Sequence, residues 1–144
     1  PAALEPNNAD AHFNLARLQG RAGRWNDAVN TLMRTLELTP NAVAVLQHTA
    51  WLLATHPDAS IRQPPQAVTL AQRAAELTNH QDIQVLDTLA AAYAATGQFD
   101  QAIQVCQQAV SRAITVNDPK PKAIQQRLEL YRERTPYRST PESR

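Results

Sequence analysis

Two six-residue stretches of this sequence share one pattern. Residues 23–28 read Gly-Arg-Trp-Asn-Asp-Ala, and residues 97–102 read Gly-Gln-Phe-Asp-Gln-Ala. Glycine ends a helix at low cost because it takes a left-handed backbone conformation without a side-chain clash. We expect the aromatic ring to fill the turn, Asn26 or Asp100 to cap the following helix, and the alanine to let two helices approach closely. The pattern therefore predicts a helix–turn–helix unit at two places in the chain.

The same register continues on both sides of these stretches. Small and large positions recur in two matching sets: His12, Leu15, Ala16, Gln19, Ala28, Leu32 and Thr35 in one, and Leu86, Leu89, Ala90, Tyr93, Ala102, Cys106 and Ala109 in the other. This spacing resembles the tetratricopeptide repeat family, whose unit of 34 residues forms two helices. The resemblance implies an all-α, right-handed superhelix in a single domain, with repeats at 9–42, 43–82 and 83–116.

The middle repeat departs from the pattern. Leu53 and Ala67 are 14 positions apart, whereas the equivalent pairs, Gln19 with Ala28 and Tyr93 with Ala102, are 9 apart. Five extra residues are therefore inserted. Prolines 57, 64 and 65 fall in this span, and proline disfavours a helix interior. We expect a loop at about 56–65 between the two helices of this repeat.

The two ends of the chain differ. Pro6 falls where Pro40 falls in the first repeat, so residues 1–8 resemble the end of a preceding repeat and suggest a cut through a longer array. Residues 119–134 instead predict one amphipathic helix, capped by Asp118 and followed by a tail at 135–144. Its apolar stripe, formed by Ile124, Leu128 and Tyr131, should cover the last repeat.

Composition and motifs point away from chemistry. No pair of the four histidines has metal-site spacing, Cys106 has no nucleophile partner in register, and no phosphate-binding glycine loop occurs. We therefore expect no enzyme, cofactor or metal. The lone cysteine leaves the compartment open between cytoplasm and periplasm, with tethering through an upstream membrane region as a further alternative.

Charge argues against nucleic acid as a partner. The net charge is +1, although residues 117–144 hold seven Lys or Arg against four acids. We interpret the basic positions Lys120, Lys122, Arg127, Arg132 and Arg134 as a solvated helix face that is partly paired with Glu129 and Glu133. No run of 18 apolar residues exists, so we expect no membrane insertion by this chain.

The resemblance to tetratricopeptide repeats also implies a binding surface. In that family the first helix of each repeat lines a concave groove that binds a peptide or helix of a partner protein. Arginines would attract acidic groups, and aromatic rings would anchor apolar ones. Carried over by position, the groove residues are Phe13, Asn14, Arg17, Arg21, Gln47, His48, Trp51, Thr55, Gln84, Asp87 and Thr88.

Two alternatives to groove binding remain. The chain is also suited to a structural or oligomerisation scaffold, in which the first repeat's face around Ala9, Phe13 and Leu18 contacts another copy. It is equally similar to the C-terminal arrays of large bacterial proteins, some of which carry membrane-embedded glycosyltransferase-type regions upstream. Either role keeps the all-α fold and changes only the partner.

Overall fold

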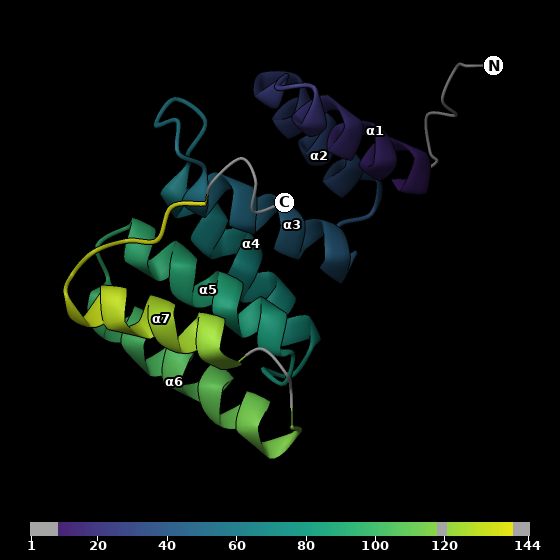
Figure 1. Ribbon diagram of the computed structural model, residues 1–144. Coiled ribbons are helices and arrows are strands. Elements are labelled where there is room, and N and C mark those ends of the chain that lie inside the picture. The colour runs from purple at the N-terminus through teal and green to yellow at the C-terminus, as the bar shows by residue number, and fades with distance from the viewer. Residues whose placement is uncertain (1–8, 118–120, 140–144) are drawn as a thin grey trace.

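The computed structural model describes residues 9–117 and 121–139, and its helices pack in consecutive pairs (Figure 1). The fold is all-α, as the repeated pattern predicts. α1 and α2 form the first pair, α3 and α4 the second, α5 and α6 the third, and α7 lies against α6. The helices are α1 (Ala9–Arg21), α2 (Trp25–Leu38), α3 (Val43–Thr55), α4 (Pro64–Leu77), α5 (Ile83–Ala95), α6 (Phe99–Thr115) and α7 (Pro121–Arg132).

Both glycine turns have the same backbone geometry. Gly23 and Gly97 have φ angles of 79° and 80°, in the left-handed region that glycine adopts without strain. Each turn is closed by a backbone bond, in which the N–H of Arg24 donates to Gln19 at 2.8 Å and that of Gln98 to Tyr93 at 2.9 Å. The chain therefore reverses direction in three residues and starts the next helix directly.

The expected side-chain caps at these turns are wrong. α2 begins at Trp25 and α6 at Phe99, so Asn26 and Asp100 lie inside the first turn rather than before it. The residues at the N-cap positions make no side-chain cap hydrogen bond. Backbone closure of the turn has replaced the side-chain cap, and Asp100 instead forms an ion pair with Arg134 at 3.0 Å.

A loop of residues 56–63 connects α3 and α4. It is anchored by Ile61, which is buried, and by a bond from the Gln63 N–H to the Leu53 carbonyl at 2.9 Å. Pro64 and Pro65, expected in the loop, are instead the first two residues of α4. Proline suits these positions because the first N–H groups of a helix have no partner within it.

Small residues bring the later helices together. Fully buried alanines such as Ala50, Ala54, Ala71 and Ala90 take the place of bulky side chains between helices. On α7, the buried side chains of Ile124, Leu128 and Tyr131 join the core of α5 and α6. Asp118 and residues 1–8 lie outside the described residues.

The first pair of helices is attached through aromatic rings. Phe13 of α1 meets His48 of α3 edge-on, with centroids 5.4 Å apart. Trp25 of α2 meets His56 at 4.7 Å. The Trp25 ring also packs on Gly20, where an added Cβ would lie 2.9 Å from a ring carbon.

Candidate functional site

The predicted groove residues on α1 form one exposed strip. Phe13, Arg17 and Arg21 follow one another at intervals of four residues, which places them on the same side of a helix. Phe13 is half-buried, whereas both arginines and Asn14 are exposed. Among the described residues neither arginine forms an ion pair. The strip thus combines an aromatic ring with two cations that face water.

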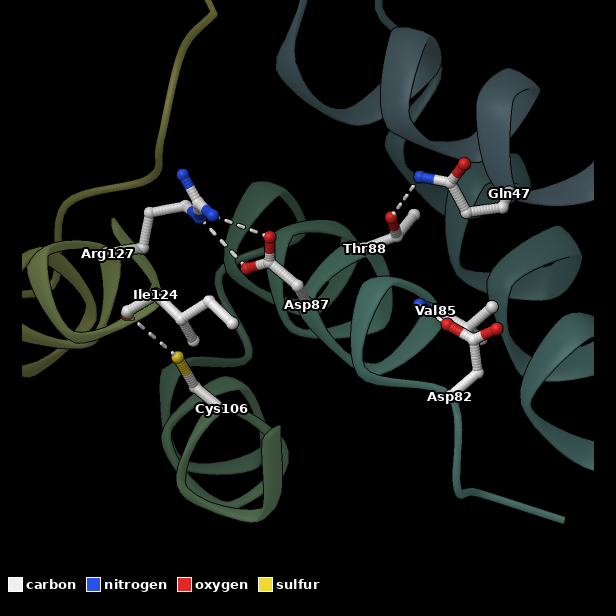
Figure 2. A network of polar contacts seen from close by, with 8 residues as sticks. All are labelled: Gln47, Asp82, Val85, Asp87, Thr88, Cys106, Ile124 and Arg127. Atoms are coloured by element: carbon white, nitrogen blue, oxygen red, sulfur yellow. Dashed lines mark hydrogen bonds and ion pairs between the residues drawn. The ribbon is translucent and has the colours of Figure 1, made fainter. Parts of the chain in front are cut away.

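On α3 the predicted residues are engaged by three different elements. Gln47 donates its side-chain N–H to the Thr88 hydroxyl of α5 at 2.8 Å (Figure 2). His48 contacts Phe13 of α1, as described above. Trp51 is half-buried, and the guanidinium of Arg127 on α7 lies over its ring, 5.4 Å from the centroid. Thr55, the last residue of α3, is fully buried.

On α5 only one predicted residue is exposed. Gln84 faces water, whereas Asp87 and Thr88 are buried. Arg127 binds the Asp87 carboxylate with two hydrogen bonds, Nε to Oδ1 at 2.9 Å and Nη2 to Oδ2 at 2.6 Å (Figure 2). Burial raises the pKa of Asp87, and the hydrogen bonds and charge of Arg127 partly offset this effect.

These contacts change the predicted surface. Thr55, Asp87 and Thr88 are buried by other parts of the chain. The exposed surface formed by the first helices of the repeats therefore includes fewer residues than the positional match to the family implied. The interpretation of Arg127 as a solvated residue is wrong, because only 15% of its side chain is exposed. By contrast, Arg132 pairs with Glu129 at 2.7 Å on the exposed side of α7. Lys120 lies outside the described residues.

Sequence reasoning missed the segment that follows α7. Residues 135–139 run back across the molecule to the end of α3 (Figure 1). Tyr137 packs against Trp51 with ring centroids 5.6 Å apart, and the backbone N–H of Ser139 donates to the Thr55 carbonyl at 2.8 Å. A segment without helix or strand periodicity gives no pattern in the sequence. Nothing in the sequence therefore indicated that residues 135–139 contact α3.

Cys106 and His12, two of the side chains considered for chemistry, are both buried. Cys106 is completely buried, and its thiol donates to the Ile124 carbonyl at 3.5 Å (Figure 2). Burial raises the pKa of Cys106 to about 12, so the thiol stays protonated at neutral pH and is a poor nucleophile. His12 is buried at a core position of α1.

Residues 9–117 and 121–139 contain neither a metal-type cluster nor a membrane-spanning helix. No three His, Cys, Asp or Glu side chains gather there as a metal site would require. None of the helices in those ranges combines the length and hydropathy that a membrane crossing needs.

Comparison with known proteins identifies the repeats. The tetratricopeptide repeat family matches residues 2–30 and residues 85–120. The chain resembles the solved crystal structure of MamA protein with a TM-score of 0.63 and 19% sequence identity, over 90% of this chain and 72% of that one. No curated protein matches the sequence. Each matched segment contains one of the two glycine–aromatic turns, Gly23 to Trp25 in the first and Gly97 to Phe99 in the second.

Proposed function

We propose that this tetratricopeptide-repeat protein binds a segment of a partner protein on the wall formed by α1 and α3. Such repeats are typically protein–protein interaction modules, and no catalytic family matches the chain. The proposed ligand is an extended peptide or a helix that carries both apolar and acidic side chains. In this proposal the chain binds its partner and does not catalyse a reaction on it.

The α1 strip is the observation that supports this proposal. Arg17 and Arg21 lie one and two turns beyond Phe13 and are free of ion pairs with other described residues. Guanidinium groups bind carboxylates with paired hydrogen bonds, and arginine is enriched among the residues that dominate interface energies. The edge contact between Phe13 and His48 links this strip to α3. A ligand would therefore meet cations on α1 and rings at the junction.

A peptide-display screen against the whole chain tests this proposal. We expect the selected peptides to be enriched in acidic residues, and the double variant Arg17→Glu/Arg21→Glu to lose at least ~10-fold in affinity for them, since interface arginines often contribute more than 1.4 kcal/mol. The matched control is Arg34→Glu on α2, an exposed arginine outside the strip. Equal affinities of the wild-type chain and the double variant would reject the proposal.

A second candidate function is self-association, which one observation favours. The Leu18 side chain on α1 is 59% exposed, which is the highest exposed fraction of any leucine in α1 and α2. Another copy of the chain would cover it, as an oligomerisation scaffold requires. Sedimentation equilibrium distinguishes the two functions. A dimer that is abolished by Leu18→Glu supports the scaffold, whereas a monomer at all concentrations rejects it.

A further inference from the structure

The segment after α7 lies on the same side of the molecule as the wall of first helices. In Figure 1 it leaves the end of α7 and returns to the end of α3. It thereby reaches Trp51, a residue of the predicted groove. Residues 135–139 form neither helix nor strand, and the chain runs stretched between the two helices in Figure 1. An extended chain of a few residues is also what a peptide ligand presents.

Trp51 and Arg127 form a seat for one aromatic side chain. The Tyr137 ring packs against Trp51 at 5.6 Å, tilted by 40°, and the Arg127 guanidinium lies 5.1 Å from the Tyr137 centroid. A cation over an aromatic face is attractive because the ring carries negative charge on its faces. Asp87 fixes Arg127 through two hydrogen bonds, so the seat is held in place by the array itself.

The second contact is to backbone. Thr55 is the last residue of α3, where carbonyl groups lack partners within the helix. Its carbonyl accepts both the N–H of Ser139 at 2.8 Å and the Ser139 hydroxyl at 3.3 Å. The N–H bond can be made by any residue other than proline, whereas the burial of Ser139 favours a small side chain at this position. This contact therefore selects a small residue two positions after the aromatic one.

The residue between them is in an unfavourable place for a cation. Arg138 is half-buried, and burial together with the nearby positive charge of Arg62 lowers its pKa. Arg62 is itself fixed, because its guanidinium donates to the carbonyls of His56 at 2.7 Å and Pro57 at 3.1 Å. The proposed ligand therefore has no requirement for a cation at this position.

We propose that residues 135–139 are an intramolecular ligand of a site formed by Trp51, Thr55 and Arg127, which a partner segment with an aromatic residue and, two positions later, a small residue occupies in their place. This inference rests on the proposed function, because it uses the same wall of first helices, and it adds the chemistry of the partner. The chain's own segment then competes with that partner and lowers its apparent affinity.

The size of this competition follows from tethering. A segment attached by a short linker has an effective concentration on the order of millimolar, so a site that it occupies most of the time binds a free peptide ~10-fold or more weakly than an open site. Residue 135 follows the end of α7 at Arg132 by three positions, which makes the tether short. Removing the Tyr137 side chain should open the site.

The test uses the full chain, labelled with ¹⁵N, and the capped peptide Thr-Pro-Tyr-Arg-Ser, followed by NMR titration. We expect Tyr137→Ala to bind this peptide ~10-fold more tightly than the wild-type chain. Adding Trp51→Ala to the Tyr137→Ala chain should abolish binding. The matched control is Thr135→Ala, an exposed position of the same segment, which should behave as wild type.

Equal affinities of the wild-type and Tyr137→Ala chains would overturn the inference, as would binding that survives Trp51→Ala. Ser139→Pro removes the N–H donor and opens the site independently, so it replaces Tyr137→Ala if that chain does not fold. The two proposals fail separately. Display-selected peptides that lose affinity on Arg17→Glu/Arg21→Glu, yet bind wild-type and Tyr137→Ala chains equally, would leave the proposed function standing and reject only this inference.

Discussion

The first helix pair and the last three helices use the same turn but are anchored to the array in different ways. Gly23 and Gly97 have nearly identical φ angles, and an aromatic residue opens the next helix after each. Towards their neighbours the regions differ. The α1–α2 pair meets its neighbours through the edges of aromatic rings and through buried aliphatic side chains such as Leu32 and Leu36. α5 is held through buried alanines and, in addition, through the Asp87–Arg127 ion pair. The glycine turn thus sets how two consecutive helices pair, and the contacts with adjacent helices set how stably that pair is attached.

This difference has an energetic consequence. An aromatic edge contact contributes roughly 0.5–1.5 kcal/mol beyond its buried area. Loss of one partner of a buried ion pair costs about 3–5 kcal/mol, because the other charge is left without a counterion. In a repeat array each unit opens according to its own interfaces. We therefore expect α1–α2 to open at a lower free energy than α5–α7.

The largest effect is expected at the buried ion pair. Arg127→Ala leaves Asp87 buried without its partner and should lower the free energy of unfolding by about 3–5 kcal/mol, measured by urea denaturation. Arg132→Ala on the same helix breaks the exposed pair with Glu129 and should cost at most ~1 kcal/mol. Similar losses in both variants would mean that α7 is not anchored through Asp87.

The next effect concerns close packing by small residues. Ala54 is completely buried, so Ala54→Leu adds three carbons where no space exists and should cost about 1–3 kcal/mol. Ala44→Leu, on the exposed side of the same helix, should change stability by less than ~0.5 kcal/mol. Urea denaturation of the two variants measures the difference. If Ala54→Leu leaves the free energy of unfolding unchanged, the packing around this part of α3 is not as tight as we expect.

Alkaline pH should act on the C-terminal region first. Cys106 keeps its proton in the folded chain because burial raises its pKa to about 12, whereas an unfolded cysteine titrates near ~8.5. The folded state therefore loses stability as pH rises above ~8.5, by at most about 1.4 kcal/mol per pH unit.

Hydrogen exchange between pH 8 and 9.5 gives the readout for this prediction. Amides of α6 and α7 should lose protection more steeply than those of α1 and α2, after correction for the intrinsic rate. Cys106→Ala is the control, since it removes the titrating group from a position where a small residue fits. The same slope in Cys106→Ala would assign the effect to another group.

The smallest effect is expected at the first junction. Phe13→Ala removes the ring contact with His48, which contributes roughly 0.5–1.5 kcal/mol beyond the buried area of this half-buried ring. The loss should appear as faster hydrogen exchange in α1 and α2 alone, with α5 and α6 unchanged. Asn14→Ala, at the neighbouring exposed position, should leave exchange as it is in the wild-type chain. Faster exchange throughout the chain would mean that the two regions unfold as one.

The sequence was sufficient for the all-α fold because local chemistry determines the helix pairs. The glycine turns and the spacing of Ala28 and Ala102 recur at fixed offsets, and such periodic signals survive in a single sequence. The caps at Asn26 and Asp100 failed because each helix has its N-cap position two residues earlier, at Arg24 and Gln98. Helix starts are sensitive to such alternatives, whereas the existence of the helix is not.

The exposure of the site residues was less predictable. The position of a residue in the repeat indicates which face of the helix it lies on, but not which other segment packs over that face. Asp87 lies at a predicted groove position, yet Arg127 of α7 reaches it from 40 positions away. Tyr137 and Ser139 reach α3 through an extended segment, whose contacts depend on where the preceding helix ends in space. Only Asn14, Arg17 and Arg21 on α1 could be placed from spacing alone, because among the described residues no later element covers these exposed side chains.

The hydrogen bond between Ser139 and Thr55 joins residues 84 positions apart. Most contacts in a helical array are local and form quickly, whereas a contact of such high sequence separation must wait until the intervening units are in place. The C-terminal segment should accordingly dock last during folding. A newly synthesised chain would then pass through a stage in which its array is complete and its Trp51 site is still empty, and a partner present at that moment would meet no competitor.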